Sequence, residues 1–242
     1  MFRRRLIGGL ASLGPIAMLP ACQAVRTGEA DDQPVRYTAP RGIGSILLVA
    51  PIVPQTRELL RRDLYRLINV GAFTIRLAIN STGGSIAAAQ AIVDDMNSMR
   101  ATQKLTFETY AVGTVASAAT YVFLHGQRRF VSSGGRIVFL GNTLVNSGGV
   151  SAERLRDEVS RMERYEQRLR ALLKARTKLT DATIDVYLRQ QVALTAEDAL
   201  RDGVVDGIAE FPRPSDGKVL SIMPRPRVTA GGTPATAPVI AP

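Results

Sequence analysis

The chain twice runs from an apolar stretch through a glycine-containing turn into a run of small residues, and this repeated pattern constrains its fold most. The first copy covers residues 77–85 (Leu-Ala-Ile-Asn-Ser-Thr-Gly-Gly-Ser) and the second covers residues 110–119 (Tyr-Ala-Val-Gly-Thr-Val-Ala-Ser-Ala-Ala). Paired glycines can present free backbone N–H groups, and the second copy places a serine at a helix start. An acyl-transfer site is assembled from these parts, provided that a base activates the serine.

Short apolar runs alternate with amphipathic stretches between residues 43 and 211, so strands and helices are expected to alternate. We expect strands at residues 45–51, 73–79, 105–112, 129–131, 136–140 and 204–211. We expect helices at residues 56–70, 85–99, 117–124, 151–176 and 180–191, and a last helix opened by a capping box at residues 195–198. The fold class is therefore α/β: repeated βαβ units form a mostly parallel sheet flanked by helices on both faces.

The longest predicted helix, residues 151–176, carries an apolar stripe from Leu155 to Leu172. This stripe packs either against the chain's own sheet or against a neighbouring subunit, and the pattern leaves both possibilities open. There is no sign of a second domain in the 242 residues.

The N-terminus is typical of a bacterial export signal. Residues 1–21 combine a basic start with an apolar run, which predicts a signal peptide, and residues 19–22 (Leu-Pro-Ala-Cys) resemble the lipobox of bacterial lipoproteins. Cys22, the only cysteine, is then expected to be lipidated and to hold the protein on the periplasmic side of a bacterial membrane. The alternative is a chance cysteine within an ordinary signal peptide.

The remaining boundaries follow from composition. Residues 22–42 are polar with scattered Gly and Pro and predict a tether, and residues 43–211 predict the folded domain. Residues 212–242 are rich in Pro, Ala and Thr and predict a disordered tail.

Charge and composition exclude several classes of function. Of the net charge of +10, three charges belong to the arginines of the signal, and the chain has no Trp, so no nucleic-acid partner is expected. A basic, anchored protein can still be attracted to anionic lipid headgroups. A single histidine and a single cysteine supply no ligand set, so neither a metal nor a cofactor is expected.

Three motifs together carry a family resemblance. Residues 79–85 match a family pattern Ile-Asn-Ser-Pro-Gly-Gly, residues 113–119 match Gly-x-Ala-Ala-Ser-Met-Gly, and residues 194–206 match Leu-Ser-Ala-x-Glu-Ala followed by Gly-Leu-Val-Asp. In this order and spacing they resemble the proteolytic subunit of the Clp protease, within the superfamily that it shares with crotonases (enoyl-CoA hydratases). The resemblance spans residues 45–208.

The resemblance implies roles for three residues. Ser117 falls on the catalytic nucleophile, and the N–H groups of Gly84 and Ala118 fall on the oxyanion hole. The physical chemistry agrees, because a well-aimed backbone donor is worth ~3–4 kcal/mol in such a hole, and a helix N-terminus favours negative charge.

The base is where the family pattern fails. Leu140 stands at the family's histidine position and Gln191 at its aspartate position. The only histidine, His125, follows Ser117 by eight residues in the same predicted helix, a rise of ~12 Å that puts it out of reach. Of the lysines that could form a Ser–Lys dyad, Lys174 is expected to lie in solvent and remain protonated.

These features lead to three hypotheses. The first is a lipid-anchored, Clp-protease-like serine peptidase homologue that has lost its catalysis and binds peptide; an active hydrolase with a non-standard base is the alternative to its inactivity. The second is a crotonase-like enzyme that binds acyl thioesters. The third is a scaffold that assembles as a homo-oligomer through residues 141–176. An ATP-driven unfoldase partner is not expected for an exported protein.

Overall fold

The structure is a computed structural model that describes residues 42–140, 151–214 and 219–223. The strands are β1 (Ile43–Leu48), β2 (Thr74–Ser81), β3 (Thr106–Ala116), β4 (Arg128–Val131), β5 (Arg136–Phe139), β6 (Val192–Leu194), β7 (Gly207–Ile208) and β8 (Leu220–Ile222). The helices are α1 (Pro54–Asn69), α2 (Ile86–Gln103), α3 (Ala118–Leu124), α4 (Ala152–Arg176), α5 (Asp181–Arg189) and α6 (Ala196–Arg201). Strands and helices alternate from β1 to β4, as the sequence predicts.

The strands form one sheet in the order β6-β5-β3-β2-β1-β8, with β4 beside β3 and β7 beside β4. Every pairing is parallel except that of β5 with β6. The predicted α/β class with a mostly parallel sheet flanked by helices is confirmed. Among the described residues, no helix is both long enough and apolar enough to span a bilayer.

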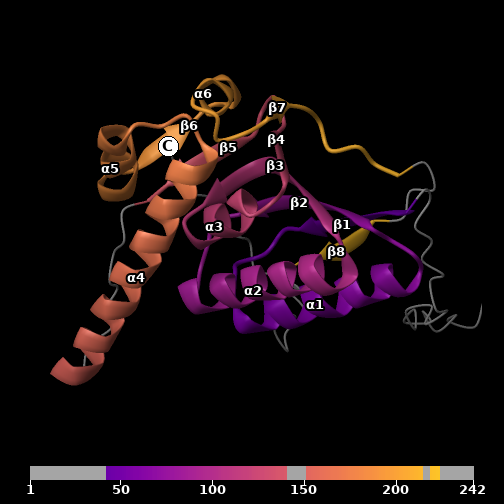
Figure 1. The fold of residues 1–242 in the computed structure, drawn as a ribbon, viewed down its shortest axis with the longest axis horizontal. Helices are drawn as coiled ribbons and strands as arrows, with labels where there is room; N and C mark the ends of the chain where they lie inside the picture. The colour runs from indigo at the N-terminus through magenta and orange to yellow at the C-terminus, as the bar shows by residue number, and fades with distance from the viewer. Residues whose placement is uncertain (1–41, 141–150, 215–218, 224–242) are drawn as a thin grey trace, which may run out of the picture. The chain divides into compact units, whose positions relative to one another are not determined.

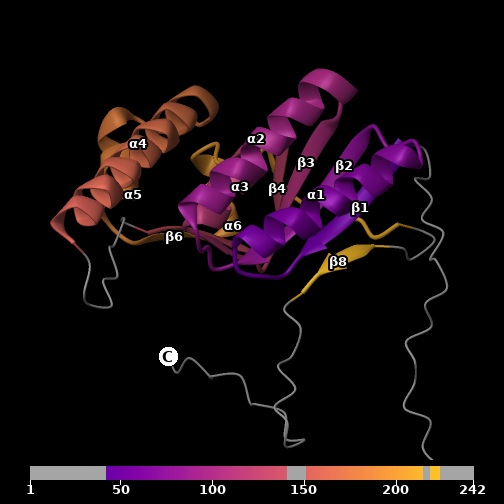
Figure 2. The ribbon, with the colours of Figure 1, turned by 90° about the horizontal axis from the view of Figure 1, so that it is seen from below.

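Helices α1, α2 and α3 lie on one face of the sheet (Figures 1 and 2). The core is built there, from fully buried side chains such as Ile75 and Leu77 of β2, which meet Leu60 of α1 and Ile92 of α2. Their burial is the main contribution to stability, at about 1.5–3 kcal/mol for each large side chain.

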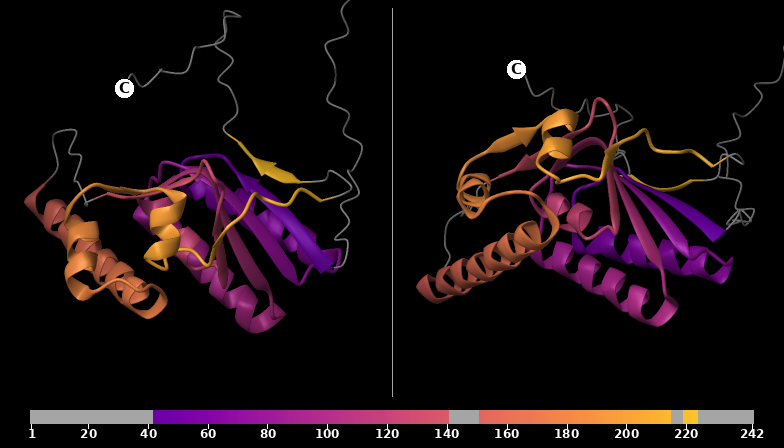
Figure 3. Two further views of the ribbon diagram at one scale, coloured as in Figure 1. Left: turned by 90° about the horizontal axis from the view of Figure 1, so that it is seen from above. Right: turned by 45° about the horizontal axis from the view of Figure 1, so that its top comes forward.

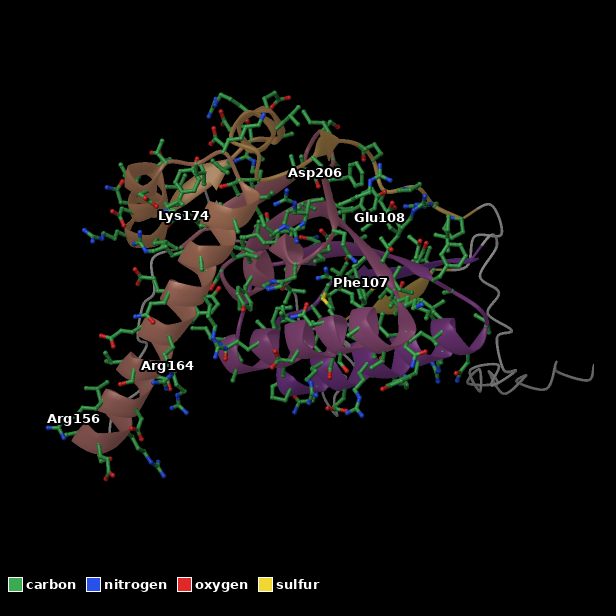
Figure 4. All side chains as sticks on the ribbon, viewed as in Figure 1. Phe107, Glu108, Arg156, Arg164, Lys174 and Asp206 are labelled. Carbon is green, nitrogen blue, oxygen red and sulfur yellow. The ribbon has the colours of Figure 1, made fainter. Side chains whose placement is uncertain are left out.

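On the opposite face of β2, β3 and β4, a charged cluster lies beside stacked aromatic side chains and no described helix covers it, so the expectation that helices cover both faces is wrong for these strands. Arg76, Glu108 and Arg128 stand side by side in register, and Glu108 accepts hydrogen bonds from both arginines at 3.0 Å. Phe107 is fully buried while Glu108 points the other way (Figure 4), as strand alternation requires. In the described part of the chain, the ribbon shows no helix over this face of β2, β3 and β4 (Figure 3).

Helix α4 is buried along only half of its length. Tyr165, Leu169 and Leu173 in its C-terminal half are buried, whereas Leu155 and Val159 near its start are 40% and 39% exposed. The chain's own fold therefore covers only part of the apolar stripe.

Two predictions about the C-terminal part of the chain are wrong. Residues 204–211 do not form a long strand, because Val204 and Val205 turn back and donate hydrogen bonds to the carbonyl of Ala199, capping α6, and only Gly207–Ile208 join the sheet. Within the expected tail, Leu220–Ile222 form strand β8 along the edge of β1, with Leu220 and Ile222 buried. The capping box at Thr195 and Asp198 is confirmed.

Candidate functional site

The paired glycines form a tight turn that only glycine can occupy. The φ values of Gly83 and Gly84 are +103° and +143°. A Cβ on Gly84 would lie 2.4 Å from the carbonyl oxygen of Ile52, and one on Gly83 would lie 2.8 Å from the Cβ of Ser117. The backbone of the turn therefore packs closely against the candidate serine, and a side chain at either glycine would not fit.

Hydrogen bonds hold this turn on both sides. The N–H of Ile52 donates to the carbonyl of Gly83 at 2.8 Å, and the N–H of Ser85 donates to the carbonyl of Ile52 at 2.7 Å. The N–H of Gly83 donates to Ser81 Oγ at 3.3 Å. The N–H of Gly84 donates to no residue that the structure describes, so it is available to a ligand.

The neighbouring strand brings the serine to this turn. β2 and β3 lose register between Ile79 and Ser81, and the side chain of Asn80 fills the irregularity by accepting a hydrogen bond from the N–H of Thr114 at 3.1 Å. A Cβ on Gly113 would lie 2.7 Å from that side chain, so the glycine makes room for it. The first motif therefore contacts the second through Asn80, at residues of β3 that precede Ser117.

Ser117 occupies a strained strand-to-helix turn. Its φ is 53° and its ψ is −124°, conformations that a residue with a Cβ adopts only when its surroundings impose them. Its N–H donates to the carbonyl of Val138 at 3.2 Å, and Thr120 Oγ1 lies 3.2 Å from the same carbonyl. Ala118 is the first residue of α3, so its N–H has no partner within the helix.

Leu140 and Gln191 stand at the same end of one strand pair. β5 and β6 pair antiparallel, with Val138 opposite Ala193 and Phe139 opposite Val192; Leu140 directly follows β5 and Gln191 directly precedes β6. Ser117 is tied to Val138, two residues before Leu140. The three positions that the family resemblance selects thus lie at one end of the sheet, but neither a leucine nor a glutamine can accept the serine's proton.

His125 lies at the far end of α3 and caps that helix. Its Nδ1 is 2.8 Å from the carbonyl of Tyr121, and burial lowers its pKa. Lys174, labelled in Figure 4, lies in solvent. Its Nζ is 2.8 Å from a carboxylate oxygen of Asp181. Both expectations from the sequence agree with these positions. Ser117 Oγ takes part in no hydrogen bond with residues 42–140, 151–214 or 219–223.

One neighbour of the site is not predicted by the sequence. The hydroxyl of Tyr165, on α4, lies 3.5 Å from the carbonyl oxygen of Ser117. Burial raises the pKa of Tyr165, so the phenol remains protonated and cannot act as a base. Tyr165 is visible in the sequence only as a member of the apolar stripe of residues 151–176, and nothing there indicates which element this stripe faces.

No group of three or more His, Cys, Asp or Glu side chains able to hold a metal ion occurs within the described ranges. Cys22, the predicted lipidation site, lies outside the described residues, as do residues 1–21 of the predicted signal peptide.

The fold and this turn define an α/β protein with a serine presented at the end of a mostly parallel sheet. A protein-family model described as Clp protease matches residues 43–211. The chain belongs to the Clp protease family.

Individual relatives agree with this assignment. The chain is 30% identical over 139 residues to ATP-dependent Clp protease proteolytic subunit 1 of Corynebacterium glutamicum, covering 57% of this chain and 64% of the relative. It is 28% identical over 136 residues to proteolytic subunit 2 of Streptomyces avermitilis, covering 55% of this chain and 66% of that one. The matched region thus spans just under two thirds of these relatives.

A solved structure shares the fold. The chain superposes on a ClpP1 mutant from Listeria monocytogenes with a TM-score of 0.58, at 23% identity, covering 72% of this chain and 93% of the other.

Proposed function

We propose that this protein is an exported, lipid-anchored homologue of the Clp serine peptidases that binds peptide beside the turn of Gly83 and Gly84 but is catalytically degenerate. The observation that carries the proposal is that Leu140 and Gln191 flank one end of the β5–β6 pair, to which Ser117 is tied through the carbonyl of Val138. A triad there would have an imidazole and a carboxylate at these two positions.

The expected loss of activity is large. Serine hydrolases that lose the nucleophile or its base lose about 10⁶-fold in turnover, and the remaining oxyanion hole and binding retain ~10³-fold over water. The free N–H of Gly84 and the first N–H of α3 supply such a hole, so the cleft keeps what is needed to bind a peptide carbonyl.

A fluorophosphonate probe tests the inactivity. It reacts with serines whose Oγ is activated by a base, so the wild-type protein is expected to label no faster than Ser117→Ala. Labelling at Ser117 with the rate of an active serine hydrolase would contradict the proposal, and would support the alternative of an active hydrolase with a non-standard base.

Peptide binding is supported by the same turn and by the family resemblance, in which an extended peptide lies beside the strand next to the paired glycines. The bridge between Ile52 and Gly84 leaves the Gly84 N–H pointing away from the hydrogen bonds that hold the turn. Such an N–H can donate a hydrogen bond to a carbonyl oxygen of a bound peptide.

The export signal and the lipidated Cys22 remain part of the proposal, on the strength of the sequence at residues 1–22. Radiolabelled palmitate fed to cells that produce the protein is expected to label the wild type and not Cys22→Ser. Equal labelling of the two proteins would contradict lipidation at Cys22.

A crotonase-like enzyme that binds acyl thioesters is the second candidate, because two free amides suit a thioester oxygen without a triad. Thermal stabilisation by acyl-CoA, with none by peptides, would favour it over the peptide-binding protein.

The protein is also proposed to form a homo-oligomer through α4, whose first half leaves Leu155 and Val159 uncovered. No ATP-driven unfoldase is expected as a partner of an exported member.

A further inference from the structure

A cavity of about 570 Å³ opens beside the Gly84 amide. One wall consists of residues 84–87, which include the glycine turn and the first residues of α2. The other wall is the middle of α4, with Arg161, Arg164 and Arg168 together with Glu158. A group bound here would lie directly beside the backbone donor that the proposed function assigns to a peptide carbonyl.

The charge on this cavity is unbalanced. Arg161 is paired with Glu158, which is the only carboxylate among the lining residues. Arg164 and Arg168 make no salt bridge with any residue in the described ranges, so two guanidinium groups remain for a ligand. The first turn of α2, on the opposite wall, carries no acidic side chain, and a helix N-terminus adds positive potential.

We infer that this cavity receives a carboxylate of the bound peptide, either an acidic side chain or the free C-terminus, and that Arg164 and Arg168 determine this specificity. The inference rests on the proposed function, since it takes the Gly84 turn as the place where the peptide binds. A guanidinium group matches a carboxylate through two parallel N–H···O bonds, which a neutral amide cannot reproduce.

The same arrangement selects against other ligands. A lysine or arginine side chain of a peptide would face uncompensated positive charge, which costs binding energy. A purely apolar side chain would displace water from the guanidinium groups and return no hydrogen bond to them.

The test compares labelled alanine hexapeptides by fluorescence anisotropy on the full-length protein. One peptide has Glu at an internal position and one has Gln there, both with amidated C-termini; a third is the Gln peptide with a free C-terminus. The matched protein variants are the double substitution Arg164→Gln/Arg168→Gln and the control Arg156→Gln. Arg156 lies at the free end of the same helix and does not line the cavity (Figure 4).

We expect at least one carboxylate-bearing peptide to bind the wild type about fivefold more tightly than the neutral peptide in dilute buffer, since an exposed pair contributes up to ~1 kcal/mol. The preference should disappear in the double variant, remain in Arg156→Gln, and fade at high salt on the wild type. Which peptide shows the preference identifies the source of the carboxylate.

Other outcomes separate the two proposals. If all three peptides bind the wild type equally, the cavity does not recognise carboxylates, while peptide binding itself stands. The same conclusion follows if Arg156→Gln loses the preference as fully as the double variant, because general surface charge would then explain it. If no peptide binds, the proposed function fails, and the inference fails with it.

Discussion

At the scale of single residues, the backbone of Ser117 is the most informative feature. A residue with a Cβ at φ 53° and ψ −124° costs ~1–3 kcal/mol, and it persists here because Val138 and Gly83 hold it from two sides. The sequence predicts the position of this serine at a helix start. It does not predict the strain, because serine carries no local signal for a positive φ; the contact that imposes it comes from residues more than 20 positions away.

The positions of Leu140 and Gln191 at one end of the β5–β6 pair lead to a prediction of regained reactivity. We expect Leu140→His/Gln191→Asp to label with a fluorophosphonate at least ~100-fold faster than the wild type, because a base and its orienting carboxylate would return to the serine. The labelling rate should rise with pH through ~6.5, as the new histidine loses its proton and becomes able to act as a base. Leu140 is 38% exposed, so the substitution should leave the fold intact.

The control for this variant carries Ser117→Ala in addition and should not label. A folded double variant that labels no faster than the wild type would show that the strained serine does not lie where a triad can be rebuilt.

At the scale of elements, α4 divides into a covered half and an uncovered half. Its C-terminal half is anchored in the core by Leu169 and Leu173, while its first half presents Leu155 and Val159 outward. The sequence predicts the helix and its stripe with nearly correct ends, but periodicity alone cannot say what covers a stripe. That information lies in the tertiary arrangement.

We predict that Leu155→Glu/Val159→Glu makes the protein monomeric in light scattering without changing its free energy of unfolding by more than ~0.5 kcal/mol, because the two side chains are uncovered in the single chain. By contrast, Leu169→Ala should cost about 2–5 kcal/mol in urea unfolding, because it removes a buried side chain. An unchanged oligomer in the Glu variant, or a monomeric wild type, would place self-association elsewhere or exclude it.

Short elements were the hardest to predict. β8 consists of three residues, too few for an alternating pattern to stand out from a Pro-rich segment, and its strand exists because β1 offers a free edge. The apolar pattern at residues 204–211 predicts a strand that does not form. Val204 and Val205 are buried because they cap helix α6.

At the scale of the whole molecule, one ion pair connects distant parts of the chain. Arg129 of β4 is almost fully buried, donates to Asp206 after α6 at 2.8 Å, and donates to the carbonyl of Arg176 at the end of α4. Partial burial alone would raise the pKa of Asp206, but the hydrogen bonds from Arg129 outweigh it and lower the pKa below its usual value.

A carboxyl with a lowered pKa stabilises the folded chain at pH values above its unfolded pKa of ~3.9, and this contribution disappears as the pH falls through the folded pKa. We therefore predict that Asp206→Asn lowers the free energy of unfolding by about 1–3 kcal/mol at pH 7, because it leaves the Arg129 charge buried without a counterion. The cost should shrink as the pH is lowered from 5 toward 3. Urea unfolding at several pH values measures this difference between variant and wild type.

Asp181→Asn is the matched control, because Asp181 pairs with Lys174 in solvent. This substitution should change the free energy of unfolding by less than ~0.5 kcal/mol at any pH. If the loss of stability in Asp206→Asn stayed constant between pH 5 and pH 3, the ionised carboxylate of Asp206 would not be its cause.

At this scale the sequence predicts much of the architecture. The order of strands and helices follows from the alternation of apolar and amphipathic stretches, and the family resemblance follows from three motifs. The arginine-lined cavity beside Gly84 does not follow, because it forms between residues about 80 positions apart in the chain. Its walls meet only once α4 packs beside the sheet.

Strand β8 has a practical consequence for handling the protein. The family match stops at residue 211, yet β8 occupies the edge of β1 that would otherwise offer a row of unpaired backbone groups. A shortened version ending at residue 211 would expose that edge to other molecules, and open edges invite intermolecular strand addition and precipitation. A soluble preparation should therefore retain at least residues 219–223.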